Sequence, residues 1–78
     1  MGTLKVGSVM FVQVERPYST DWVLGSVSEI LSDSVTVEGT VVTRVERATG
    51  LSVEPDVSAT VTVPMELVDS DEAEVLEW

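Results

Sequence analysis

The 78-residue sequence contains no cysteine and no histidine. These absences exclude disulfide bonds, thiolate and imidazole metal sites, cysteine nucleophiles and histidine general bases. Aromatic residues make up only 5% of the chain, and four side chains carry positive charge: Lys5, Arg16, Arg44 and Arg47. A domain of this size buries only about 60% of the surface that its unfolded chain exposes. Additional stability must therefore come from close packing, dissolved salt or partners.

Long apolar runs and targeting signals are also missing. No stretch approaches the roughly 20 apolar residues that are needed to span a bilayer. The N-terminal segment MGTLKVGSVMFV lacks the basic region, long apolar run and small-residue cleavage site of a secretory signal. Val6 stands where the myristoylation pattern requires Ser or Thr. We therefore expect a protein that no signal peptide directs to secretion.

Acidic residues dominate the charge: fourteen Asp and Glu residues give the chain a net charge of −10. Such a surface repels phosphates, so we expect no direct binding to nucleic acid or to anionic membranes. Two explanations of the acidity stay open. The carboxylates can steer association with a basic partner, as those of a nucleic-acid mimic would. Alternatively, they suit a salty solvent, because this acidic, lysine-poor composition resembles that of proteins from salt-loving organisms and salt screens their self-repulsion.

The composition predicts an all-β protein. Seventeen residues are valine and eight are threonine, and β-branched side chains fit a pleated surface better than a helix. Several short strands separated by turns, without internal repeats or a linker, indicate one small barrel or a compact β-sandwich of about five to seven strands. Closure into a barrel would also remove the sheet edges that invite aggregation.

The first segment alternates in a way that assigns its faces. The apolar side chains at even-numbered positions are predicted to face the core: Leu4, Val6, Met10, Val12 and Val14. Val9 and Phe11 break the alternation, which makes them candidates for a second buried face or a partner-covered face. An ordinary exposed apolar pair is the alternative.

Turn residues divide the rest of the chain. We predict a loop at residues 15–21 and turns at 32–34 and 48–50; the strands between and after them are expected at 22–31, 35–38, 41–47, 51–54 and 57–63. Gly39 allows a bend or bulge, and Gly50 suits a positive φ. In the last of these strands the side chains predicted to point inward are Val57, Ala59, Val61 and Val63. Pro64 should end that strand or place it at a sheet edge.

The C-terminal segment is acidic but ends in an apolar cluster. We predict a single barrel domain over residues 1–68 and an acidic tail over 69–78, which packs on the barrel or on a neighbour as one helical turn or as an extended segment. Asp69 and Asp71 have the spacing that begins a calcium loop, but Ala73 and Glu74 occupy positions that require an oxygen ligand and glycine. A solvated acidic tail is therefore preferred to a metal site.

Catalytic patterns are lacking as well. No serine lies in a G-x-S-x-G turn, and no histidine is present to activate one. Pairs of carboxylates arise by chance among fourteen acidic residues, so they carry no signal for glycosidase chemistry. We expect a protein that is not an enzyme and that uses no cofactor.

Three short segments carry a resemblance to a known family. GSVMFVQV (residues 7–14), WVLGSV (22–27) and SVTVE (34–38) together resemble the first three strands of SH3-like barrels, particularly those of the Tudor and Agenet kind. The resemblance covers roughly the first half of the chain. It implies an SH3-like barrel as the fold.

The resemblance also implies a binding mode. Tudor-like readers hold methylated lysine or arginine in an aromatic cage by cation–π attraction, and the candidate cage residues here are Phe11, Tyr18 and Trp22. The second half of the chain supplies no aromatic residue before Trp78. Trp22 therefore also fits a packing role within the barrel, with Gly25 allowing a bend or a close backbone approach.

Small SH3-like barrels also resemble components of tailed viruses, including head-completion proteins, head–tail connectors and capsid-associated modules. Our leading hypothesis is a structural module of a virion, found in the particle or the host cytoplasm, that binds itself or other particle proteins. The alternatives are an acidic nucleic-acid mimic that inhibits a host defence protein, and a reader of basic or methylated peptides. The candidate protein-interaction residues are Val9, Phe11, Tyr18, Trp22, Arg44, Arg47, Val75, Leu76 and Trp78.

Overall fold

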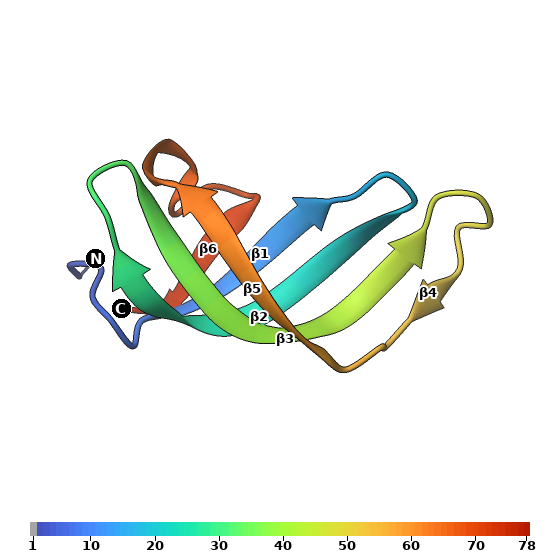
Figure 1. Cartoon of the computed structure of the whole chain (residues 1–78), viewed down its shortest axis with the longest axis horizontal. Helices are drawn as coiled ribbons and strands as arrows, with labels where there is room; N and C mark the ends of the chain where they lie inside the picture. The colour runs from blue at the N-terminus through green and yellow to red at the C-terminus, as the bar shows by residue number, and fades with distance from the viewer. Residues whose placement is uncertain (1) are drawn as a thin grey trace.

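The computed structural model describes residues 2–78 and confirms the all-β prediction (Figure 1). The elements in chain order are β1 (Val9–Glu15), β2 (Ser19–Ile30), β3 (Ser34–Glu46), β4 (Ser52–Val53), β5 (Val57–Pro64), the 3₁₀ turn η1 (Met65–Leu67) and β6 (Ala73–Glu77). The six strands form one antiparallel sheet in the order β4-β3-β2-β1-β6, and β5 also pairs with β3. No helix in the described part of the chain is long and apolar enough to cross a membrane.

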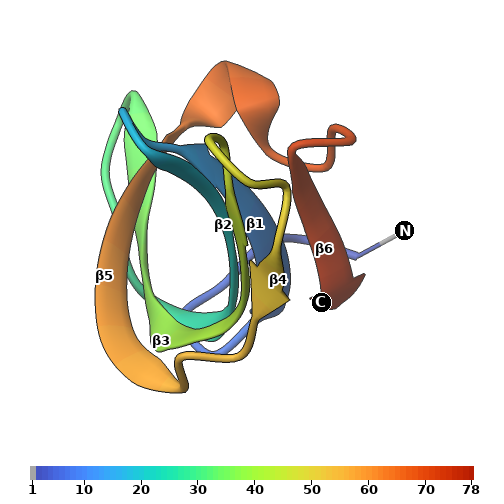
Figure 2. The same ribbon diagram turned by 90° about the vertical axis from the view of Figure 1, so that its right-hand side faces the viewer.

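The sheet curls because its two longest strands bend (Figure 2). Gly25 of β2 and Gly39 of β3 lie directly opposite each other in the antiparallel register. A Cβ atom on Gly39 would lie 2.1 Å from the Leu24 carbonyl oxygen, so the two backbones approach each other more closely than side chains permit. Gly39 therefore marks a bend with a close approach, while the register shifts in this strand pair fall elsewhere.

Small aliphatic side chains from five strands fill the concave side of the curled sheet. The buried core cluster comprises Met10, Val12, Val27, Val35, Val37, Val63, Ala73 and Val75, and Leu4, Val14, Val61, Val68 and Trp78 pack against it. The alternation in the first segment therefore predicted its core residues from Met10 onward. Closely packed valines compensate for the scarcity of aromatic residues.

Four local predictions were wrong. The two strands expected at 35–38 and 41–47 are one continuous strand, β3, because its pairing with β2 and β5 runs through Gly39. Val6 is 63% exposed, because it lies in a turn before β1, where alternation no longer assigns a face. Ser19–Asp21, predicted as loop, begin β2 and pair with β3. Val57 begins β5 beyond the main core cluster and is exposed, although Val61 and Val63 of the same strand do face the core.

The C-terminal segment adopts the extended alternative. Residues 73–77 form β6, which pairs antiparallel with β1 and contributes Ala73 and Val75 to the core. The Ser8 hydroxyl donates a hydrogen bond of 2.9 Å to the Trp78 carbonyl oxygen, which fixes the chain beyond β6. Backbone pairing and apolar packing, rather than helix formation, hold this acidic segment against the domain.

Candidate functional site

The two ends of the curled sheet face each other without backbone pairing in the described chain. β5 pairs only with β3, and β6 covers β1 only from Val9 to Val12. The last part of β1, residues 13–15, therefore has a strand partner on the β2 side alone. The ring of strands stays open between β1 and β5, and we call this opening the seam.

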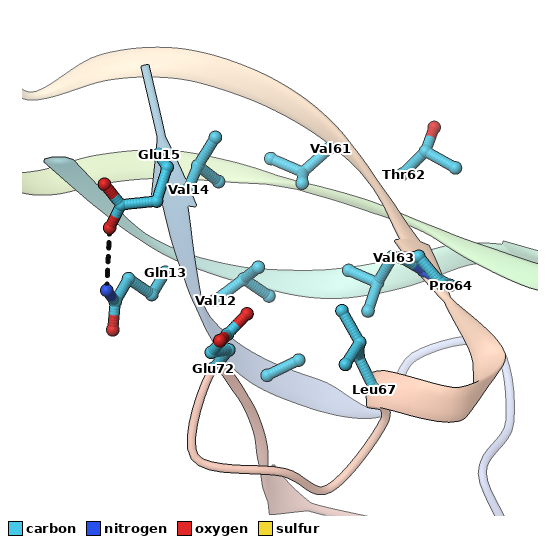
Figure 3. Close-up of a pocket in the computed structure, with 11 residues that line it drawn as sticks. Val12, Gln13, Val14, Glu15, Val61, Thr62, Val63, Pro64, Leu67 and Glu72 are labelled. Atoms are coloured by element: carbon cyan, nitrogen blue, oxygen red, sulfur yellow. Dashed lines mark hydrogen bonds between the residues drawn. The ribbon is translucent and has the colours of Figure 1, made fainter. Parts of the chain in front are cut away.

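A groove of about 190 Å³ lies along the seam. It is lined by Val12, Gln13, Val14, Glu15, Val61, Thr62, Val63, Pro64, Leu67, Glu72 and Ala73. Figure 3 shows the valine side chains of β1 and β5 pointing toward each other across the groove, with the carboxylates of Glu15 and Glu72 near its rim. The groove thus combines an apolar floor with acidic groups at its margin.

The β5 edge of the seam presents unpaired backbone groups. The Met65 N–H donates a hydrogen bond of 2.9 Å to the Asp33 carbonyl oxygen, so this position faces β3. Backbone groups of successive strand residues point alternately to the two sides. The N–H and C=O groups of Thr60 and Thr62 therefore point away from β3, toward the seam. Pro64 shares their parity, so its missing N–H also falls on the open edge, as expected for a proline at an edge strand.

Glu15 is held at the rim as an ionised carboxylate. The Gln13 side-chain amide donates a hydrogen bond of 2.9 Å to it, and Arg47 and Thr20 also donate to its oxygens. These donors, with the Gln13 amide first, lower the pKa of Glu15 below its ordinary value. Glu72 is exposed and fixes the neighbouring backbone, since its carbonyl oxygen accepts a 2.7 Å hydrogen bond from the Gln13 N–H.

A second polar cluster lies at the β1–β2 hairpin. Asp21 has no exposed surface and accepts hydrogen bonds from Ser19 (2.9 Å), Arg16 (2.8 Å) and both Nε (2.9 Å) and Nη2 (3.0 Å) of Arg44. The Arg44 hydrogen bonds are the main reason that the pKa of Asp21 falls to about 2. Sequence reasoning missed this cluster, because Asp21 and Arg44 meet only through the register of β2 and β3.

The structure places the three candidate aromatic residues in two different surroundings. Phe11 pairs with Leu24 across β1 and β2, and Trp22 lies opposite Gln13, so both half-buried rings occupy the face of the sheet that points away from the core, with Val9. Tyr18 lies in the β1–β2 turn and is 86% exposed. Phe11 and Trp22 thus share a surface, while Tyr18 lies at the end of the hairpin.

The other predicted interaction residues also have different surroundings. Arg44 supports Asp21, and the Arg47 Nε donates a hydrogen bond of 3.0 Å to the Arg16 carbonyl oxygen, so both arginines stabilise the hairpin end. In β6, Val75 lies in the core, whereas Leu76 is 51% exposed. Trp78 is half-buried against the core cluster.

The acidic turn before β6 makes hydrogen bonds within the chain. The Asp69 N–H donates to the Ala73 carbonyl oxygen at 2.7 Å, and Asp69 has a positive φ of 67°. Across residues 2–78, no group of three carboxylates is placed to hold a metal ion. This turn therefore positions β6 beside β1.

Comparison with known proteins identified no relative: no protein-family model, no curated protein and no solved structure matched this chain. The open seam and its groove are therefore the features from which we infer a function. They combine an incomplete backbone edge, apolar side chains and negative charge in one place.

Proposed function

We propose that this protein is a non-enzymatic structural module that assembles with other proteins, and that its setting is a tailed-virus particle, as a capsid-associated, head-completion or connector component. The observation that carries the proposal is the open seam beside an apolar groove. An unpaired strand edge is a template for another chain, and proteins that remain monomeric usually cover such edges. A neighbouring subunit that covers this edge would complete the ring of strands.

The path of the chain supports the SH3-like part of the proposal. β1, β2 and β3 form a meander whose curl is set at Gly25 and Gly39, and the C-terminal strand returns to pair with β1. Such a small ring places both sheet ends close to the same groove. Its compactness suits a module that fits between larger subunits, an argument from fold-level analogy.

The proposal is tested by affinity capture from the native source at its own ionic strength, with partners identified by mass spectrometry. We expect capsid, portal or tail proteins to be recovered by the wild-type chain and lost with Val61→Lys, which places a charge in the groove. Thr43→Lys, on the face of β3 away from the core, is the matched control and should recover the same partners. Absence of the protein from purified particles would contradict the virion setting.

One observation favours the acidic-mimic alternative as a second candidate. Arg16, Arg44 and Arg47 all participate in the contacts of the hairpin end, which leaves Lys5 as the one positive side chain elsewhere. Every carboxylate in the chain except Asp21 is exposed. Most of the surface therefore presents negative charge with little opposite charge beside it.

This alternative has its own measurement, the affinity for basic nucleic-acid-binding proteins of the host across a range of salt concentrations. A mimic should bind one such protein tightly at low salt and lose affinity as salt screens the charges. Affinity that does not change with salt would exclude this mode of binding.

A further inference from the structure

We infer that the outer edge of β5 accepts an extended segment of a partner protein as an added strand, and that apolar residues of this segment alternate with basic ones. The inference rests on the proposed assembly function and names the chemistry of the partner at the seam. Strand addition combines main-chain hydrogen bonds with pockets for alternate side chains. The seam offers both an open backbone edge and a groove for side chains.

The backbone of β5 supplies the hydrogen-bonding groups. Thr60 and Thr62 direct their N–H and C=O groups away from β3, by the alternation established from the Met65–Asp33 hydrogen bond. Pro64 ends the edge because it has no N–H to offer. The edge is therefore short, which limits the added strand to a few residues and defines where it must lie.

The size of the groove determines which side chains the added segment can place inward. Its volume of about 190 Å³ is smaller than the roughly 300–1,000 Å³ of typical small-molecule pockets, but it suits individual aliphatic side chains. Alternate residues of a strand point to the same face. Every second residue of the added segment would therefore contact the apolar floor formed by Val12, Val14, Val61 and Val63.

Charge determines which side chains suit the outward-pointing positions of the added segment. Residues that point outward would lie near the exposed Glu72 and near Glu15, which already forms an ion pair with Arg47, and the chain as a whole carries a net charge of −10. Lysine or arginine at these positions would be attracted both by the rim and by the overall field. A second copy that offered its own β5 would bring another −10 to the seam, and its β5 contains no basic residue, so a basic partner segment is favoured over self-pairing.

The inference is tested with blocked synthetic peptides of about six residues that alternate valine and lysine, the length of a typical strand. Hydrogen exchange followed by NMR should show slower exchange of the Thr60 and Thr62 amides when the peptide is added. A valine–glutamate peptide should bind at least about tenfold more weakly, because its negative charges have the same sign as those of the rim and are repelled by them. A valine–lysine peptide N-methylated at alternate amides should lose binding, because it cannot form the edge hydrogen bonds.

A matched pair of variants tests the β5 side. Thr62→Pro removes the outward N–H without removing a hydrogen bond to β3, and Thr62→Val keeps that N–H. We expect Thr62→Pro to weaken binding about five- to tenfold, the effect of one lost backbone hydrogen bond, and Thr62→Val to change it less than about twofold. Circular dichroism checks that each variant is folded, and the N-methylated peptide gives the same test on the unaltered protein.

The outcomes separate this inference from the proposed function. Unchanged amide exchange at Thr60 and Thr62, or equal binding of the N-methylated peptide, would overturn strand addition. If particle proteins were still captured in that case, and the capture were insensitive to Thr62→Pro, assembly would stand and would use another surface. Dimerisation of the protein alone through β5, seen by sedimentation, would overturn the basic-partner part of the inference.

Discussion

The Asp21 carboxylate has no exposed surface, and it forms ion pairs with two guanidinium groups that are partly exposed to water. Removing a carboxylate from water is costly unless its oxygens are fully hydrogen-bonded. Here Arg16, Ser19 and Arg44 together satisfy both oxygens. The cluster ties the β1–β2 hairpin to β3, so its effect on stability should exceed that of an ordinary surface ion pair.

The pH dependence of stability should reveal this cluster. The pKa of Asp21 is lowered from 3.8 to about 2, so its contribution is fully present above the unfolded value and is lost as the pH falls through the folded value. The shift corresponds to about 2 kcal/mol. We expect Asp21→Asn to be destabilised by about this amount near neutral pH, with the difference from wild type shrinking between about pH 4 and about pH 2.

Urea unfolding over this pH range measures the difference directly. Glu15→Gln is the control, since Glu15 is exposed and water screens its ion pair with Arg47. It should lower stability less than Asp21→Asn does. A constant difference between Asp21→Asn and wild type at every pH would show that the carboxylate charge does not contribute.

Among the elements, β2 and β3 determine the curvature. Their facing glycines leave no room for a side chain, because a Cβ atom on Gly25 would lie 2.5 Å from the Glu38 carbonyl oxygen. Without this close approach the sheet would be flatter, and β5 would not be carried across the core toward β1. The groove at the seam therefore depends on two residues that do not line it.

We expect Gly39→Ala to destabilise the fold by about 3 kcal/mol, because the added methyl group meets backbone atoms that cannot move aside easily. Gly50→Asn is the control: Gly50 has a φ of 72° in open space, and asparagine tolerates this conformation, so the change should stay within about 0.5 kcal/mol. Thermal unfolding followed by circular dichroism compares the two. Equal midpoints would contradict the close-packing account.

Strand β6 offers a comparison between adjacent residues. Val75 lies in the core at 8% exposure, whereas Leu76 is exposed. Val75→Ala should cost about 2 kcal/mol through lost packing and a cavity, and Leu76→Ala should change stability by less than about 0.5 kcal/mol. Urea unfolding measures both. Similar effects for the two variants would mean that β6 is not held against β1 in solution as the structure shows.

For the molecule as a whole, shape and charge distribution are linked. The domain is elongated, with extents of 39 × 21 × 20 Å. The β1–β2 hairpin and the β3–β4 connection lie at one end, and the β2–β3 turn and the C-terminus lie at the other (Figure 1). Arginines gather at the hairpin end, whereas exposed carboxylates occur along the whole domain, including Glu15 at the hairpin end itself. Repulsion among these carboxylates opposes folding when little salt is present.

Added sodium chloride should therefore stabilise the protein. Raising the salt to about 1 M shortens the Debye length to about 3 Å, and a gain of about 1 kcal/mol would raise Tm by roughly 4–8 °C. Combined neutralisation by Glu66→Gln, Glu72→Gln and Glu74→Gln should reduce this salt effect. Differential scanning calorimetry provides the measurement. A Tm that falls with salt would show that attractive ion pairs outweigh the self-repulsion.

Local patterns were sufficient for much of the fold. Met10, Val12 and Val63 were predicted to face the core, and each does, since side-chain direction in a strand alternates regardless of which strand lies beside it. Gly50 has the predicted positive φ because the turn geometry is set within a few residues. The same reasoning failed for Val6, where no strand existed to impose the alternation.

The candidate site could be predicted only in part. Val61 and Val63 were assigned to an inward face, and Pro64 to a strand end or sheet edge, but nothing local indicated that β1 would lie across from them. The Asp21 cluster was not predicted at all. Contacts between distant segments depend on strand register, which a single sequence does not display.

The sequence by itself determined the strand-forming composition, the excess of negative charge and the lack of thiol or imidazole chemistry, because these follow from side-chain identity and local alternation. Only the tertiary structure decided that Asp21 meets Arg44, that Gly25 meets Gly39, and that the ring stays open between β1 and β5. The physical reason is that each of these features is a pairing between segments far apart in the chain. Their geometry is set by the curl of the whole sheet.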